Sequence, residues 1–160
     1  MKMDEFARIL FKNAVLKEQS AHRMYIELAQ KAKKKIIKDL FLKLAEEELV
    51  HERLFSKMSL SVLKIVNRAP LENLNLLKGI DKIIIGLSIK DIDNALDFAI
   101  SEEQKAYDDY NMITNYIEFG EARETFQEIA RQELRHKTLL QKVKLEFNDN
   151  DWNTLKIKSE

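Results

Sequence analysis

The stretch "EEELVHERL" (residues 46–54) decides the fold of this sequence, because it places an acid and an imidazole on the inner face of a helix. Glu48 and His51 are three residues apart, so on an α-helix their side chains point the same way. Leu44 and Phe55 continue that face as apolar positions on either side. A core-facing stripe that carries both a carboxylate and an imidazole needs an explanation other than packing.

Four segments have apolar residues three and four positions apart, which is typical of amphipathic helices. The predicted helices run from about Met3 to Lys31, from about Lys34 to Met58, from near Ser88 to before Gly120, and from about Glu121 to Phe147. Ser88 and Asp91 resemble a capping box at the start of the third helix. Three glycines and one proline in 160 residues leave few interruptions, so long helices are favoured.

The turns within each pair of helices are short, so residues 3–58 and 89–147 each predict an antiparallel hairpin. Residues 59–88 separate the hairpins and are long enough to run the length of a bundle of about 40 Å. We expect a short helix within this crossover. The sequence therefore predicts an all-α four-helix bundle over residues 1–147, followed by a polar tail at 148–160.

The second hairpin repeats the first after a shift of 85 residues, with no insertion. The shift carries Glu18 onto Glu103, Glu48 onto Glu133 and His51 onto His136, and the apolar positions around them also correspond. Each half therefore has one helix with a lone inward glutamate and one helix with Glu-x-x-His. A single Glu-x-x-His on a charged helix is usually a solvated surface feature, but two at equivalent repeat positions are not.

The residues one turn from these acids cannot neutralise them: they are Ala14, Ala21, Leu44, Ala99, Ala106 and Ile129. Four carboxylates in an apolar core are costly unless they take up protons or bind cations. Two divalent ions would balance four carboxylates, and the two imidazoles would give each ion one nitrogen ligand. We therefore predict a dinuclear metal site; the alternative is a decayed repeat whose acids are protonated or solvated.

Composition excludes several other classes of function. The formal net charge is zero and the charges are interleaved, so no basic face exists for nucleic acid. The absence of cysteine excludes disulfides and thiolate sites. The beginning "MKMDEFARIL" lacks the apolar segment of a signal peptide, and "IIIGL" (83–87) is too short to cross a bilayer. We expect a cytoplasmic protein with no membrane partner.

With these six residues the chain resembles the ferritin-like di-iron carboxylate superfamily, in particular rubrerythrin-type proteins that lack a rubredoxin domain. The resemblance covers about residues 3–147. It implies that Glu48 and Glu133 bridge two metals, and that one glutamate and one histidine complete each site. The remaining ligands are then Glu18, Glu103, His51 and His136. Two iron ions per chain are implied, with manganese or zinc as alternatives.

The resemblance also suggests a role for two tyrosines. Tyr25 and Tyr110 lie seven residues after Glu18 and Glu103. Tyrosines near these positions in rubrerythrin-like proteins hydrogen-bond the metal-binding glutamates and orient them. The alternative is an ordinary core tyrosine. We expect His22 to lie at the edge of the site rather than to bind metal; Trp152, in the polar tail, is either a packing residue or a partner contact.

The chain departs from related families at three points. It has no cysteine, so the resemblance implies a separate electron donor, such as rubredoxin. The extra glutamate that rubrerythrin has after its third-helix ligand is replaced by Ala106, which puts in doubt the metal shift linked to that glutamate. The haem-binding methionine of bacterioferritin is replaced by Leu49, so we expect no haem of that kind.

The function implied by the resemblance is two-electron reduction of hydrogen peroxide or dioxygen by a di-iron oxidoreductase in oxidative-stress defence. Three alternatives remain open: a ferroxidase of an iron-storage cage, a di-iron oxidase of an organic substrate, and a non-catalytic helical module. Exposed faces of such bundles often pair, so we expect a homodimer. The intact ligand set within one chain argues against a miniferritin, in which the metals lie between subunits.

Overall fold

A computed structural model describes residues 1–58, 60–78 and 92–147, and in this part of the chain all the elements are helices apart from an isolated β-bridge between Ile65 and Ile117. The four long helices are α1 (Met3–Lys31), α2 (Lys35–Lys57), α3 (Ile92–Asn115) and α4 (Glu121–Glu146). The predicted all-α bundle is confirmed, and the bounds of α1, α2 and α4 agree with prediction to within one residue. The expected capping box at Ser88, Trp152 and the tail 148–160 lie outside the described residues.

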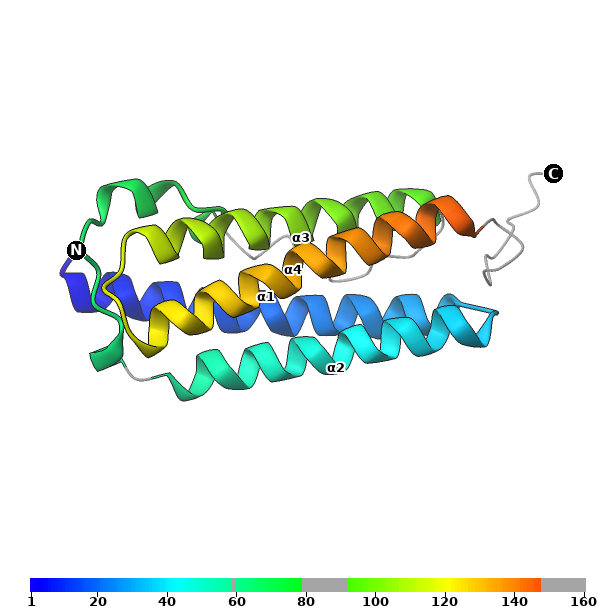
Figure 1. The fold of residues 1–160 in the computed structure, drawn as a ribbon, viewed down its shortest axis with the longest axis horizontal. Coiled ribbons are helices and arrows are strands. Elements are labelled where there is room, and N and C mark those ends of the chain that lie inside the picture. Colours follow the sequence, from blue (N-terminus) through cyan, green and yellow to red (C-terminus); the bar gives the residue numbers. More distant parts are fainter. Residues whose placement is uncertain (59, 79–91, 148–160) are drawn as a thin grey trace.

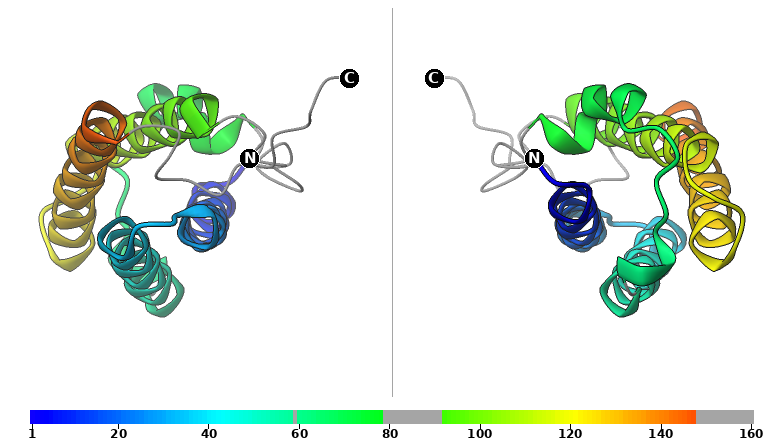
Figure 2. Two further views of the ribbon diagram at one scale, coloured as in Figure 1. Left: turned by 90° about the vertical axis from the view of Figure 1, so that its right-hand side faces the viewer. Right: turned by 90° about the vertical axis from the view of Figure 1, so that its left-hand side faces the viewer.

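The four helices form two antiparallel hairpins, α1–α2 and α3–α4, which face each other across the interior of the bundle (Figures 1 and 2). Each connection is short, at residues 32–34 and 116–120. Gly120 has φ +145° and precedes the first residue of α4, so it begins this helix instead of ending α3. Glycine suits this position because other residues rarely adopt such a backbone conformation. None of the helices in the described ranges is both long enough and apolar enough to cross a membrane.

The end of α2 and the beginning of α3 lie at opposite ends of the bundle. Phe55 of α2 packs in one hydrophobic cluster, and Ala95 of α3 packs in the other. The predicted short helices occur in the described part of the crossover as three 3₁₀ turns, at Leu60–Val62, Ala69–Asn73 and Asn75–Leu77. The carboxylate of Asp109 on α3 accepts hydrogen bonds from the backbone N–H groups of Asn75 and Leu76, which fixes the last turn against the bundle.

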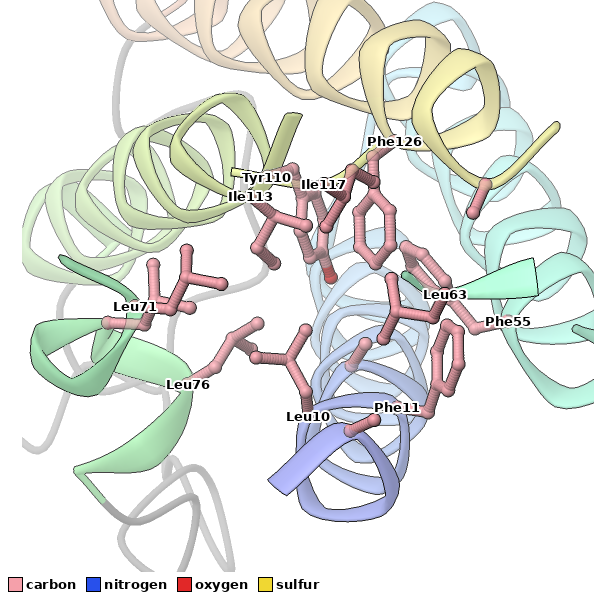
Figure 3. Close-up of a cluster of buried hydrophobic side chains, with 14 of the residues drawn as sticks. Leu10, Phe11, Phe55, Leu63, Leu71, Leu76, Tyr110, Ile113, Ile117 and Phe126 are labelled. Carbon is pink, nitrogen blue, oxygen red and sulfur yellow. The ribbon is translucent and has the colours of Figure 1, made fainter. Parts of the chain in front are cut away.

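Two hydrophobic clusters fill the two ends of the bundle and leave a polar layer between them. In the first cluster, the rings of Phe11, Phe55, Tyr110 and Phe126 meet within 6.3 Å between adjacent centroids (Figure 3). The second cluster lies on the other side of the polar layer, and its members include Met24, Phe41, Leu96 and Leu140. Tight packing above and below holds the intervening side chains in place and keeps water away from them.

Candidate metal centre

The polar layer contains all six residues that the sequence singles out as metal ligands, and every one of them is buried. Their ligand atoms form two groups, and within each group all atoms lie within 4.8 Å of one another. One group holds Glu18 and His51, the other holds Glu103 and His136, and both include Glu48 and Glu133. We call these the His51 half and the His136 half. Each half thus combines one glutamate from α1 or α3 with one histidine from α2 or α4.

The two shared glutamates turn one oxygen toward each half. Glu48 places Oε2 3.1 Å from Nδ1 of His51 and Oε1 2.9 Å from Nδ1 of His136. Glu133 places Oε1 2.8 Å from Nδ1 of His51 and Oε2 3.6 Å from Nδ1 of His136. The imidazole rings stack with centroids 5.8 Å apart. A carboxylate that divides its oxygens in this way is placed to bridge two ions.

The donor atoms converge on common points and leave several of them unsatisfied. Glu48 Oε1, Glu133 Oε1 and His136 Nδ1 are buried and have no hydrogen-bond partner among the described residues. Glu48 Oε1 and His136 Nδ1 are only 2.9 Å apart, yet they are not aligned for a hydrogen bond. Buried polar atoms without partners are rare and costly. Cations would satisfy all three atoms, so the residues present fit a metal centre.

The separations also suit metal ligation. Two ligands each about 2.1 Å from one ion can be at most about 4.2 Å apart. No separation within either group exceeds 4.8 Å, so the outermost ligands need to close by no more than a few tenths of an ångström. Oxygen ligands with one nitrogen per half are typical of iron or manganese sites in proteins.

Without cations, protons must balance the buried charge. Burial raises the pKa of Glu18 and Glu103 well above the usual range, and the charge of Glu133 adds to the effect. Burial also disfavours ionised Glu133, but its contacts with Glu103, His136 and His51 outweigh this effect and hold its pKa well below normal. Burial lowers the pKa of His136, whereas its contacts with Glu133, Glu47 and Glu48 more than reverse this and raise it to about 12.

Two tyrosines hold the unshared glutamates Glu18 and Glu103, and each tyrosine belongs to the opposite hairpin. Tyr25 donates a hydrogen bond to Glu103, and Tyr110 donates one to Glu18. Burial and the neighbouring carboxylates raise the pKa of both hydroxyls well above 10.0, so each keeps its proton and remains a donor. The sequence pointed to these tyrosines but did not indicate which glutamate each one contacts, because that glutamate lies in the opposite hairpin.

The outer nitrogen of each histidine is also fixed, by residues that the sequence analysis missed. Nε2 of His51 donates to Oε1 of Gln132 at 2.8 Å, and Nε2 of His136 donates to Oε2 of Glu47 at 2.8 Å. This fixes the Nε2–H on the outside and directs Nδ1 into the centre. Glu47 and Gln132 each precede the glutamate of a Glu-x-x-His, and the 85-residue shift relates them. The equivalent positions of Glu47 and Gln132 in the repeat are the sequence feature that could have indicated these two partners.

A buried ion pair lies beside the centre on the α1–α3 side. Nζ of Lys17 is 3.1 Å from Oε2 of Glu102 and 3.2 Å from its carbonyl oxygen. These two residues are also repeat equivalents, and each precedes an unshared glutamate. His22 lies outside both ligand groups, and its Nδ1 donates to the carbonyl of Ala45 at 2.9 Å, which links α1 to α2.

Comparison with known proteins agrees with this arrangement. The model of the family described as Rubrerythrin matches residues 10–144, a range that includes all six buried glutamates and histidines. No curated protein and no solved structure gives a significant match to the chain. The family resemblance that the repeated Glu-x-x-His pattern indicated is therefore confirmed.

Proposed function

This chain belongs to the rubrerythrin family, a ferritin-like di-iron family, and from that premise we propose that it reduces hydrogen peroxide or dioxygen by two electrons. The proposed centre holds two iron ions per chain, with manganese or zinc as alternatives. Its ligands are the six buried residues Glu18, Glu48, His51, Glu103, Glu133 and His136. The proposed role is oxidative-stress defence in the cytoplasm.

The observation that carries this proposal is the sharing of Glu48 and Glu133 between the two ligand groups. A site for one ion would need only one of the groups, so two groups with common carboxylates support a centre for two ions. Glu48 and Glu133 would hold two ions next to each other, as a two-electron reaction at an O–O bond requires.

When bound, two ferrous ions supply the two electrons that, with two protons, convert one hydrogen peroxide into two waters. The chain supplies the fixed ligand geometry and the exclusion of bulk water. The polar layer is closed on both sides by buried side chains that are at most 1% exposed: Leu44, Phe55 and Ile129. A low-polarity wall strengthens every electrostatic contact inside the layer.

Tyr25 and Tyr110 are positioning residues in this proposal. Each donates a hydrogen bond from its hydroxyl to one oxygen of an unshared glutamate. The second oxygen of that glutamate is therefore directed toward the centre. Their raised pKa values make them poor acids, which suits hydrogen-bond donors that must stay in place. The protons consumed in the reaction then come from water.

The electrons that reduce the centre again come from a separate donor protein such as rubredoxin, since these 160 residues contain no cysteine to ligate a rubredoxin-type iron. We further propose a homodimer. Leu42, Val50 and Leu54 expose apolar side chains along the outer side of α2, a strip suited to a second copy of the chain. Analytical ultracentrifugation that gave a monomer would reject this part of the proposal.

The test is an anaerobic titration of metal-free protein with ferrous iron, followed by oxidation with peroxide or with dioxygen. We expect saturation at two irons per chain, and faster oxidation by whichever oxidant is the substrate. Iron uptake far beyond two, as mineral, would favour the storage function instead. Oxidation that needs an added organic compound would favour the oxidase function.

A pair of variants assigns the iron to this centre. Glu48→Ala removes an oxygen from both ligand groups and is expected to abolish retention of iron. Glu46→Ala is the matched control, because Glu46 is an exposed glutamate of the same helix. If both variants retained two irons, the ligand assignment would be wrong.

A further inference from the structure

The outer partners of the two histidines differ, although the ligands of the two halves correspond one for one. Nε2 of His136 donates directly to the carboxylate of Glu47 at 2.8 Å. Nε2 of His51 donates at the same distance to the neutral amide oxygen of Gln132. Glu47 and Gln132 occupy equivalent positions of the repeat, so the outer partner of one histidine carries a charge and that of the other is neutral.

The residues that contact Gln132 and Glu47 in turn make the surroundings of the two histidines more alike. Nε2 of Gln132 donates to Oε1 of Glu128 at 3.0 Å, so a carboxylate also lies behind His51, one amide farther away. An arginine contacts each carboxylate: Arg131 pairs with Glu128 and Arg135 with Glu47. The arginines therefore do not distinguish the halves. The difference is that the carboxylate acts on His136 directly and on His51 only through an amide.

A carboxylate that accepts the Nε2–H of an imidazole pushes electron density toward Nδ1 and makes that nitrogen a stronger metal ligand. A neutral amide does the same to a smaller extent, because it carries only a partial charge. The positive ion is also attracted directly by the nearer carboxylate. Both effects favour the His136 half.

We propose that the two halves of the centre are inequivalent and that Glu47 is the positioning residue which makes the His136 half bind its metal ion first. This inference rests on the proposed function, since it assumes that the six residues bind two ions. Outer partners of this kind typically change metal affinity about 10- to 100-fold. A tenfold preference would place about nine-tenths of the first ion in the His136 half.

The chain allows a direct test, because it contains only three histidines. Metal-free protein labelled with ¹⁵N-histidine is titrated with Zn²⁺, and the ring nitrogens of His22, His51 and His136 are followed by NMR. We expect the Nδ1 resonance of His136 to reach most of its final change at one equivalent. His51 should change mainly between one and two equivalents, and His22 serves as the internal reference.

Two reciprocal variants test whether Glu47 is the cause. Glu47→Gln gives both histidines an amide partner, so the two resonances should change together and the affinity of the His136 half should fall about tenfold. The double variant Glu47→Gln/Gln132→Glu exchanges the partners and should place the first ion in the His51 half. Glu46→Gln, at an exposed position, should leave the wild-type order unchanged. Circular dichroism checks that each variant is folded.

The possible outcomes separate this inference from the proposed function. If both histidines respond to Zn²⁺ but do so together in the wild type, or His51 responds first, the inference is wrong and the dinuclear site stands. An order that persists in Glu47→Gln would show that Glu47 does not set it, and would also overturn the inference. If neither histidine responds by two equivalents, the site assignment itself fails.

Discussion

The hydroxyl of Tyr110 donates a hydrogen bond to Oε1 of Glu18, a residue 92 positions earlier in the chain and in the other repeat. Tyr25 makes the equivalent bond to Glu103. The two hairpins are therefore joined at the level of the proposed metals by a reciprocal pair of hydrogen bonds. Each half of the centre depends on a tyrosine from the opposite hairpin.

Removing one of these hydroxyls should weaken metal binding. In Tyr110→Phe the carboxylate of Glu18 loses the donor that orients it, and we expect the affinity of the His51 half for metal to fall about tenfold. The metal-free protein should also lose about 1–3 kcal/mol of unfolding free energy, since a buried oxygen is left without a partner. Chelator competition measures the first effect and urea denaturation the second.

Tyr107→Phe is the control for this variant, because Tyr107 is a tyrosine of the same helix that is only partly buried. The control should keep wild-type affinity. Equal losses in the two variants would mean that the hydroxyl of Tyr110 has no specific role in orienting Glu18.

Replacing an unshared glutamate by glutamine should stabilise the metal-free protein and weaken metal binding. Burial penalises the ionised form of Glu18, so the neutral isostere in Glu18→Gln should stabilise the metal-free protein. A gain of about 1 kcal/mol would raise the melting temperature by about 3 °C. The same variant should retain about one metal ion per chain, since the other ligand group excludes Glu18.

Calorimetry and metal analysis of Glu18→Gln and Glu103→Gln together check this trade-off. Glu27→Gln is a suitable control, because Glu27 is a glutamate of α1 outside both ligand groups. Loss of both ions in Glu18→Gln would contradict the division of the site into two halves.

The stability of the metal-free protein should fall as the pH rises above neutrality. The pKa of His136 is raised from 6.5 to about 12 in the folded state, and that of His51 is also raised. Folding therefore favours protonated histidines; their stabilising contribution is complete below about pH 6.5 and is lost as the pH rises toward 12. Glu18 and Glu103, whose pKa values are raised above 4.5, act in the same direction above pH 4.5.

Glu48 and Glu133 change the stability with pH in the opposite direction, because contacts with the histidines lower their pKa values despite burial. Their contribution is present above pH 4.5 and is lost as the pH falls below it. We therefore expect maximal metal-free stability at about pH 4.5–6.5. Metal binding should improve with rising pH, because ions displace protons. Thermal melts from pH 4 to 9, with and without Zn²⁺, measure both trends; parallel trends would argue against metal–proton competition.

The buried pair of Lys17 and Glu102 should be coupled strongly. Lys17→Met leaves Glu102 buried with only Lys105, at 2.8 Å, to balance it. We expect a loss of about 3 kcal/mol of unfolding free energy. The double variant Lys17→Met/Glu102→Leu removes both charges and should recover most of that loss. Urea denaturation of the wild type, both single variants and the double variant gives the coupling energy; additive losses would show that the pair contributes no coupling.

Much of the site could be predicted because its signals are local and repeated. The three-residue spacing of Glu48 and His51 sets both on one helix face, and the 85-residue shift shows that Glu133 and His136 do the same. Glu47 and Gln132 follow the same shift but were missed. Each lies one residue off the inward stripe, about 100° around the helix, where a polar side chain is usually solvated.

The amino-acid sequence by itself determined the helices, the two hairpins and the residues that face the interior, because helical periodicity depends only on spacing along the chain. Only the tertiary structure decided which side chains meet across the hairpins. The crossed hydrogen bonds from Tyr25 to Glu103 and from His51 to Gln132 depend on how two helix faces pack against each other. That packing is set by the apolar clusters above and below the polar layer, and no spacing within one helix specifies it.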